Sequence, residues 1–216
     1  MSNAKTPKTL DVEQQKQLLE ALLKTSSPVP TARKGIRNHL MACLMLDAGL
    51  RVGEVVSLKL SHIFFNYEPV RTLVLTPSIT KNHKERTVPV GTRLRDSLIS
   101  YRTNFVPPNA IIYDDYCFYT SDSKHCMTTR QVENIITTAA LKCWGRRINP
   151  HMLRHTYASR MMRVTNMRTV QELLGHNYIT STQIYTHPNE DDKFKAMVDL
   201  ENREDPTHPD HPLPDE

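Results

Sequence analysis

Four side chains within residues 150–187 are of types, and at spacings, that would allow them to act on one reacting group. They are His151, Arg154, His176 and Tyr185. His151 and Arg154 stand three positions apart, so they share one face if this segment is helical. A guanidinium group can grip two oxygens of a phosphate, and an imidazole can donate or relay a proton. The hydroxyl of Tyr185, nine positions after His176, can serve as a covalent nucleophile. Together these residue types indicate chemistry on a phosphate ester.

Short helices are expected to bring these side chains together. Asn149 is a favourable N-cap and Pro150 a favourable first helical residue, so a helix is predicted to begin there. A capping-box pattern from Thr169 and a glycine stop at Gly175 predict a second helix, which ends just before His176. A third helical stretch is expected to carry the tyrosine.

Three motifs in this segment are more specific than their single residues. They read His-x-x-Arg-His-Thr-x-Ala from His151, Leu-Leu-Gly-His ending at His176, and Thr-Gln-Ile-Tyr-Thr-His around Tyr185. In this order and spacing they resemble the C-terminal motifs of the tyrosine recombinases, a family that includes phage integrases and Xer-type resolvases. The resemblance implies that Tyr185 attacks a DNA phosphorus, with His151 as a candidate base and His176 as a hydrogen-bond donor. It also implies that Arg154 holds the non-bridging oxygens.

A second arginine for the same phosphate is predicted upstream, in Gly-Leu-Arg-Val-Gly-Glu at residues 49–54. Two guanidinium groups suit a phosphate because the charge on its non-bridging oxygens grows in the transition state. From local sequence alone, Arg51 could equally be a surface residue that pairs with Glu54 across one helical turn. The resemblance implies that Arg51 is the first catalytic arginine and that Glu54 supports and orients the site.

The catalytic lysine of the family lies on a hairpin, and a small three-stranded antiparallel sheet is predicted from residues 61–66, 71–76 and 85–90. The resemblance places that lysine, which protonates the departing oxygen, at Lys81. The two glycines usual around this turn are replaced here by Thr80 and Asn82. Lys84 therefore remains the alternative general acid, and a basic turn that only touches the DNA backbone remains a further alternative.

The rest of the chain reads mainly as helices, so the predicted fold class is α+β and mostly α-helical, as in the catalytic domain of the family. Helices are expected from residue 11, over 32–48 and 91–101, from residue 128, and over 189–203. Basic residues near the hairpin and at the end of the helix that starts at residue 128 are weaker candidates for DNA contacts: Lys84, Arg86, Lys142, Arg146 and Arg147.

Zinc is the main alternative for the histidines, because His151 and His155 have the four-residue spacing of zinc-binding helices. However, Met152 stands where a metalloprotease has its glutamate, and Arg154 puts positive charge beside such an ion. No metal and no other cofactor is therefore expected.

Charge favours a polyanionic partner. The 216 residues carry a net charge of +5, with pI near 9.0. Residues 204–216 contain five acids and no Lys or Arg, so residues 1–203 carry 28 basic and 18 acidic residues, a net +10. The four cysteines form no C-x-x-C pair, and no segment resembles a signal peptide or membrane span. A cytoplasmic, nucleoid-associated protein is expected.

These observations predict three segments: a cloning remnant or flexible start at 1–8, a catalytic domain at 9–203, and an acidic, proline-rich disordered tail at 204–216. The N-terminal DNA-clamping domain usual in the family is expected to be absent. The predicted function is site-specific recombination or integration through a covalent 3'-phosphotyrosine, without metal or ATP. Alternatives are a type IB topoisomerase-like nicking-closing enzyme and a DNA-binding module that does not exchange strands. The expected partner is double-stranded DNA, bound by a homo- or hetero-tetramer that is monomeric without it.

Overall fold

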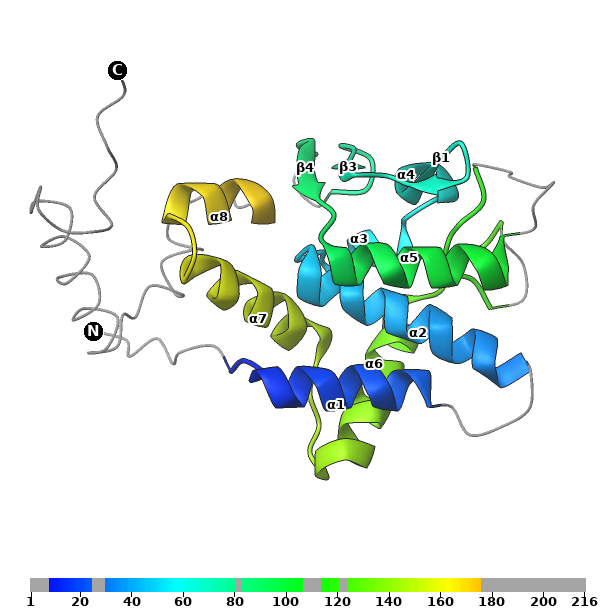
Figure 1. Cartoon of the computed structure of the whole chain (residues 1–216), viewed down its shortest axis with the longest axis vertical. Coiled ribbons are helices and arrows are strands. Elements are labelled where there is room, and N and C mark those ends of the chain that lie inside the picture. The colour runs from blue at the N-terminus through cyan, green and yellow to red at the C-terminus, as the bar shows by residue number, and fades with distance from the viewer. Residues whose placement is uncertain (1–7, 25–29, 81–82, 107–113, 121–123, 176–216) are drawn as a thin grey trace, which may run out of the picture. The chain divides into compact units, whose positions relative to one another are not determined.

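A computed structural model of the chain describes residues 8–24, 30–80, 83–106, 114–120 and 124–175. All of them belong to one compact unit, Met1–Tyr185, while the second unit, Thr186–Glu216, lies outside the described residues. Within the described ranges the chain forms eight helices and four short strands (Figure 1), which confirms the predicted helix-rich α+β class. None of these helices combines the length and apolar character that crossing a membrane requires.

Helix α2 (Pro30–Asp47) is the centre of the core. Its residues 40–46 are all fully buried, as expected for a stretch of helix that is apolar on every side. Helices α1 (Val12–Leu23), α5 (Thr92–Phe105) and α7 (Pro150–Met162) pack against it (Figure 1). The first arginine of the predicted pair follows α2, and the second lies on α7, so α2 connects the two halves of the site.

Two helix starts, those of α1 and α6, follow from local capping chemistry at the positions that the sequence predicts. The Asp11 carboxylate accepts a hydrogen bond from the Gln14 backbone, and the Gln14 side chain accepts one in return from the Asp11 N–H. Thr128 and Gln131 form the same reciprocal pair at the start of α6 (Thr129–Trp144). These caps fix the ends of two of the helices that enclose α2.

The sheet prediction is wrong in its strand pairing. Instead of one three-stranded sheet, the described residues form two separate antiparallel pairs. Strand β3 (Thr72–Leu75) pairs with β4 (Arg86–Pro89), while β1 (Phe64–Phe65) pairs with β2 (Glu68–Pro69). The predicted first strand begins instead as the short helix α4 (Leu60–Ile63).

Two local features explain this difference. The ring of His62 accepts a hydrogen bond from the backbone N–H of Lys59 at 2.9 Å, which closes a helical turn where a strand is predicted. Asn66 and Tyr67 both adopt positive φ angles, 46° and 67°, so the chain reverses one residue earlier than predicted. The reversal pairs Phe65 with Glu68 and leaves the predicted strand only two residues long.

Two short helices carry the candidate site. Helix α3 (Val52–Val56) begins directly after Arg51, and α8 (Met167–Leu174) ends at Gly175. The N-cap of α8 is Asn166, whose side chain accepts from the Thr169 N–H at 2.9 Å; the predicted start at Thr169 is therefore too late. The glycine stop is confirmed, since Gly175 adopts the left-handed conformation with φ of 62°.

Candidate active site

A buried carboxylate lies at the centre of the candidate site. Glu54, on α3, is only 2% exposed, and each of its two carboxylate oxygens accepts two hydrogen bonds. Arg86 donates from Nη1 to Oε1 at 2.8 Å and from Nη2 to Oε2 at 2.7 Å. Arg51 donates from Nη1 to Oε1 at 2.9 Å and from its backbone N–H to Oε2 at 2.8 Å. Glu54 therefore fixes both arginines from the interior of the protein.

The charges of this cluster favour an anion. Burial by itself raises the pKa of Glu54, but the hydrogen bonds and charge of Arg86, the Arg51 N–H and the charge of Arg154 outweigh it. The pKa of Glu54 is consequently below its ordinary value, and the group is a carboxylate at neutral pH. Three guanidinium groups surround one carboxylate, so a net positive charge remains to stabilise a phosphate.

Arg154 joins three elements of the fold. Its side chain is 5% exposed and lies 3.9 Å from Glu54 Oε2. Nη1 donates to the carbonyl of Gly49, and Nη2 donates to the carbonyl of Leu174 at 2.7 Å. Arg51 reaches the next carbonyl, that of Gly175, at 3.5 Å. Both arginines thus lie against the C-terminus of α8, where exposed carbonyls attract positive charge.

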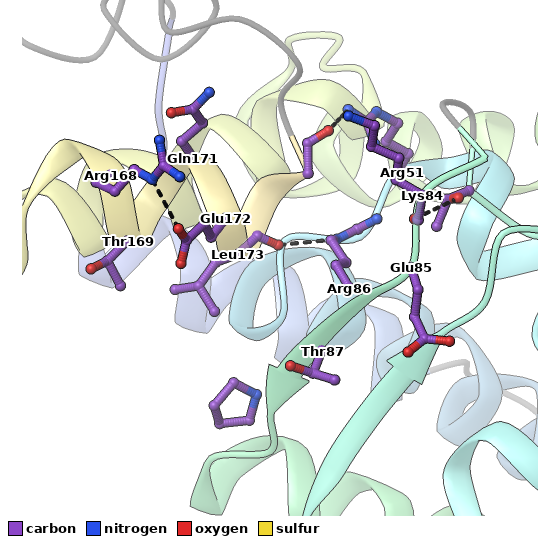
Figure 2. Close-up of a pocket in the computed structure, with 13 residues that line it drawn as sticks. Arg51, Lys84, Glu85, Arg86, Thr87, Arg168, Thr169, Gln171, Glu172 and Leu173 are labelled. Carbon is purple, nitrogen blue, oxygen red and sulfur yellow. Dashed lines mark hydrogen bonds and ion pairs between the residues drawn. The ribbon is translucent and has the colours of Figure 1, made fainter.

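An open cleft adjoins this cluster, between α8 and the strand β4 (Figure 2). Its volume is about 630 Å³. The residues around it include Arg51, Thr80, Lys84, Glu85, Arg86, Thr87, Arg168, Thr169, Gln171, Glu172 and Gly175. The side chain of Arg51 is 19% exposed, so its guanidinium can be reached from this cleft while Glu54 holds it from behind.

The end of α8 is packed closely onto Arg86. The Nε of Arg86 donates to the carbonyl of Leu173 at 3.0 Å, as Figure 2 shows. A Cβ atom at Gly175 would lie 3.0 Å from the Arg86 Cδ, in addition to its left-handed φ. Glycine at this position therefore allows both the helix stop and the close approach of the arginine. The residue that follows is His176, which lies outside the described residues.

The structure brings together Arg51, Glu54 and Arg154, three of the predicted site residues. His151 lies on the first turn of α7 with an exposed side chain and is not among the cleft-lining residues of the described chain. On the next turn His155 is half-buried, and its pKa is lowered by burial and then by the charges of His151 and Arg154. The ring centroids of the two histidines are 6.3 Å apart.

The two candidate general acids differ in what the structure describes. Lys81 lies outside the described residues, as does the predicted nucleophile, Tyr185. Lys84 is exposed and borders the cleft, and its backbone carbonyl accepts a hydrogen bond from the Thr80 hydroxyl at 2.9 Å. The choice between the two lysines stays open.

Arg86, a weak candidate for DNA contact in the sequence analysis, is buried and does not lie on the surface. It is 8% exposed, and its Nε, Nη1 and Nη2 all donate to protein acceptors. The alternation of side chains along the strand could have revealed that Arg86 is buried. Arg86 lies on the same face of β4 as the fully buried Val88, whereas Thr87 between them is exposed. An arginine at an inward-facing position needs a buried acceptor, and Glu54 supplies it.

The other weak DNA-binding candidates lie on the surface. Lys142, Arg146 and Arg147 are exposed at the end of α6 and just beyond it. The guanidinium of Arg146 stands over the ring of Trp144, 5.5 Å from its centroid. Their contact with DNA stays a prediction. Elsewhere in the described part of the chain, no three His, Cys, Asp or Glu side chains gather as metal ligands.

The chain matches the model of the Phage integrase family over residues 8–192. Among curated proteins, it is 35% identical over 204 residues to the tyrosine recombinase XerD of Rickettsia bellii (strain RML369-C). That match covers 90% of this chain but 64% of the relative, so the chain spans less than two thirds of the relative's length.

Solved structures show the same fold. The XerA recombinase superposes with a TM-score of 0.70 and 25% identity, covering 93% of this chain and 66% of that one. The XerH site-specific recombinase bound to its difH substrate gives a TM-score of 0.67 at 22% identity, covering 93% of this chain and 56% of that one. The comparison with XerH concerns the fold alone.

Proposed function

Because this chain belongs to the phage integrase family, we propose that it is the strand-transfer catalytic domain of a tyrosine recombinase. It cleaves one DNA strand, holds the end as a 3'-phosphotyrosine and passes it to a different strand. The covalent link conserves the energy of the broken bond, so rejoining requires no ATP.

The observation that carries this proposal is the arginine pair anchored on Glu54 beside the cleft. Arg51 and Arg154 lie 103 positions apart in the sequence (154 − 51), yet both are oriented by the same buried carboxylate and by the last carbonyls of α8. Such fixed positive groups stabilise a phosphate whose charge grows in the transition state without having to reorganise. Removing one comparable contact typically slows catalysis by about 10²–10³-fold.

The chemical step forms one bond and breaks one. The Tyr185 oxygen bonds to the phosphorus, and the bond from phosphorus to the 5' oxygen breaks. A free tyrosine has a pKa of about 10, so its proton must be removed as it attacks, with His151 as the base. Lys81, or alternatively Lys84, donates the proton that the departing 5' oxygen takes up. His176 donates a hydrogen bond to a non-bridging oxygen.

Double-stranded DNA is the proposed partner. The excess positive charge of residues 1–203 supports this choice, as does the recombinase name that the curated relative carries. We further propose that a tetramer assembles on two DNA sites in the cytoplasm and that the domain alone is monomeric. Recombination is favoured over topoisomerase activity because of the Xer recombinases to which the chain is similar.

A suicide duplex, nicked so that the cleaved fragment diffuses away, tests the proposed chemistry. Wild-type protein is expected to form a covalent protein–DNA adduct, and Tyr185→Phe should abolish it while retaining DNA affinity, since one hydroxyl adds little to a phosphate-dominated interface. Tyr178→Phe is the matched control and should keep full activity. Adduct formation should also persist in EDTA. Activity that EDTA removes and Mg²⁺ or Zn²⁺ restores would contradict the mechanism, as would an adduct that survives Tyr185→Phe.

A further inference from the structure

We propose that Arg86 is a positioning residue for strand cleavage, which acts through Glu54 to hold Arg51 toward the cleft. This inference rests on the proposed function and concerns a residue that does not itself touch the DNA. Arg86 is the first residue of β4, and the sequence between β3 and β4 contains Lys81 and Lys84.

The contacts of Arg86 link the elements that carry the predicted catalytic groups. Its two Nη atoms bind Glu54, the partner of Arg51 at the start of α3. Its Nε binds the carbonyl of Leu173, and its side chain packs against Gly175, the residue before His176. One side chain therefore joins strand β4, the start of α3 beside Arg51, and the C-terminus of α8.

The hydrogen-bond capacity of Glu54 explains how this contact acts on Arg51. A carboxylate has about four lone-pair sites, and here two donors from Arg86 and two from Arg51 occupy them. Because Arg86 fills two sites, the Arg51 side chain binds Glu54 through Nη1 alone. Its Nη2 makes a long contact of 3.5 Å with the Gly175 carbonyl, and the remaining N–H donors of its guanidinium are kept for a phosphate in the cleft. Without Arg86, the vacated carboxylate sites attract the Arg51 guanidinium and turn it away from the cleft.

The burial of the pair argues for a role beyond stability. The side chains of Arg86 and Glu54 are 6% and 2% exposed, so both are largely removed from water. The cost of removing two charges from water often cancels the attraction between them, which makes such a pair a weak contributor to stability. The Arg86 guanidinium binds Glu54 through two nitrogens and also holds the end of α8. A role in orienting the site explains this arrangement better than a contribution to stability.

Three variants separate these roles: Arg86→Met, Arg86→Lys and, as a matched control, Arg95→Met. Arg86→Met keeps a long side chain but removes every donor. Arg86→Lys keeps the positive charge that Glu54 requires, so this variant should fold even if the Met variant does not. Its single ammonium group cannot reproduce the three hydrogen bonds that Arg86 makes to Glu54 and to the Leu173 carbonyl. Arg95→Met removes an exposed positive charge from α5.

Single-turnover adduct formation at saturating protein is the first measurement, with DNA affinity and melting temperature measured alongside. A small displacement of a catalytic group can slow a reaction by about 10²-fold, and we expect a loss of that order for Arg86→Met and a substantial loss for Arg86→Lys. DNA affinity and the Arg95→Met control should stay close to wild type. Wild-type cleavage rates in the folded Lys variant would overturn the proposal.

A double-mutant cycle tests whether Arg86 acts through Arg51. If it does, Arg86→Met should cost much less in an Arg51→Lys background than in the wild type, because the same interaction is already impaired. Independent, additive losses would show that Arg86 supports the fold without orienting Arg51, and would overturn the proposal.

Phenylglyoxal labelling, followed by mass spectrometry of the peptide that contains Arg51, provides a readout that does not depend on activity. The guanidinium of Arg51 should react severalfold more slowly in Arg86→Met, because Glu54 then binds it more fully, and at the wild-type rate in Arg95→Met. If wild-type protein forms no adduct with the suicide duplex, the proposed function fails, and the labelling alone decides the role of Arg86. Equal labelling of Arg51 in wild type and Arg86→Met would overturn the role inferred for Arg86.

Discussion

Glu54 shows how a single buried residue can orient a site whose ligand it does not touch. A carboxylate in the interior is unfavourable unless hydrogen bonds and charges compensate it, and here Arg51, Arg86 and Arg154 do so. In return, the carboxylate fixes the direction of the guanidinium groups. Replacing it should therefore affect both stability and catalysis, and the two effects can be measured separately.

The lowered pKa of Glu54 predicts how the stability of the protein depends on pH. Its contribution is fully present above the ordinary value of 4.5 and is lost as the pH falls through the lower, folded-state pKa. The free energy of unfolding of wild type should therefore exceed that of Glu54→Gln most at neutral pH, and the difference should shrink below pH 4.5. Urea denaturation between about pH 7 and about pH 3 measures it. A difference that stays constant over this range would contradict the prediction.

Residue identities in the site were easier to predict than residue environments. The motifs and the family resemblance that they carry indicated Arg51, Glu54 and Arg154, which the structure brings into one cluster. The same approach made Arg86 only a weak candidate for DNA contact and did not predict its burial. Its true environment depends on Glu54, 32 positions away, and pairings across such a distance cannot be read from local spacing.

At the scale of the elements, capping chemistry was the most reliable guide. The starts of α1, α6 and α7 depend on side chains within three residues of the first turn, so their sequences suffice. The prediction of a strand over residues 61–66 failed for two local reasons. The hydrogen bond from the Lys59 N–H to the His62 ring closes a helical turn, and the chain already turns at Asn66. Short strands are decided by such local contacts and by the tertiary packing around them.

The junction between α2 and α3 should be intolerant of any side chain at Gly49. Its φ is 63°, and a Cβ atom there would lie 2.4 Å from the Cδ1 of the buried Tyr157. Gly49→Ala should cost roughly 2–4 kcal/mol of stability through left-handed strain and overpacking. It should also displace the carbonyl that Arg154 binds and so slow cleavage.

Gly53→Ala is the matched control, measured by the same denaturation experiment. Gly53 lies within α3, and a Cβ there would meet nothing within 4 Å. Alanine at a compatible helical position usually stabilises a protein by about 0.4–1 kcal/mol, so the two substitutions should shift stability in opposite directions. Equal effects at both positions would show that the close approach to Tyr157 does not govern the junction.

At the scale of the whole described unit, the N-terminal segment is bound to the helix that carries Arg154. The backbone N–H of Leu10 donates to the hydroxyl of Thr156, which is 1% exposed, at 2.9 Å. Thr156 in turn donates to the carbonyl of Met152, one helical turn earlier on α7. Leu10 therefore lies beside the helix of the site, although the two residues in contact are 146 positions apart in the sequence.

The charge distribution over the whole chain gives a last prediction, on affinity for DNA. Deleting residues 204–216 raises the net charge from +5 to +10, because that segment holds five acids and no Lys or Arg. Non-specific affinity for a random duplex should then rise at low salt, and the gain should fade as salt screens charges beyond about 10 Å at 0.1 M.

Replacing the five acids with their amides leaves the chain length unchanged and should reproduce the gain if charge is the cause. Titrations at two salt concentrations measure both variants. Unchanged affinity at low salt would mean that the acids lie too far from the DNA path to repel it, and a gain on deletion alone would assign the effect to the bulk of the segment.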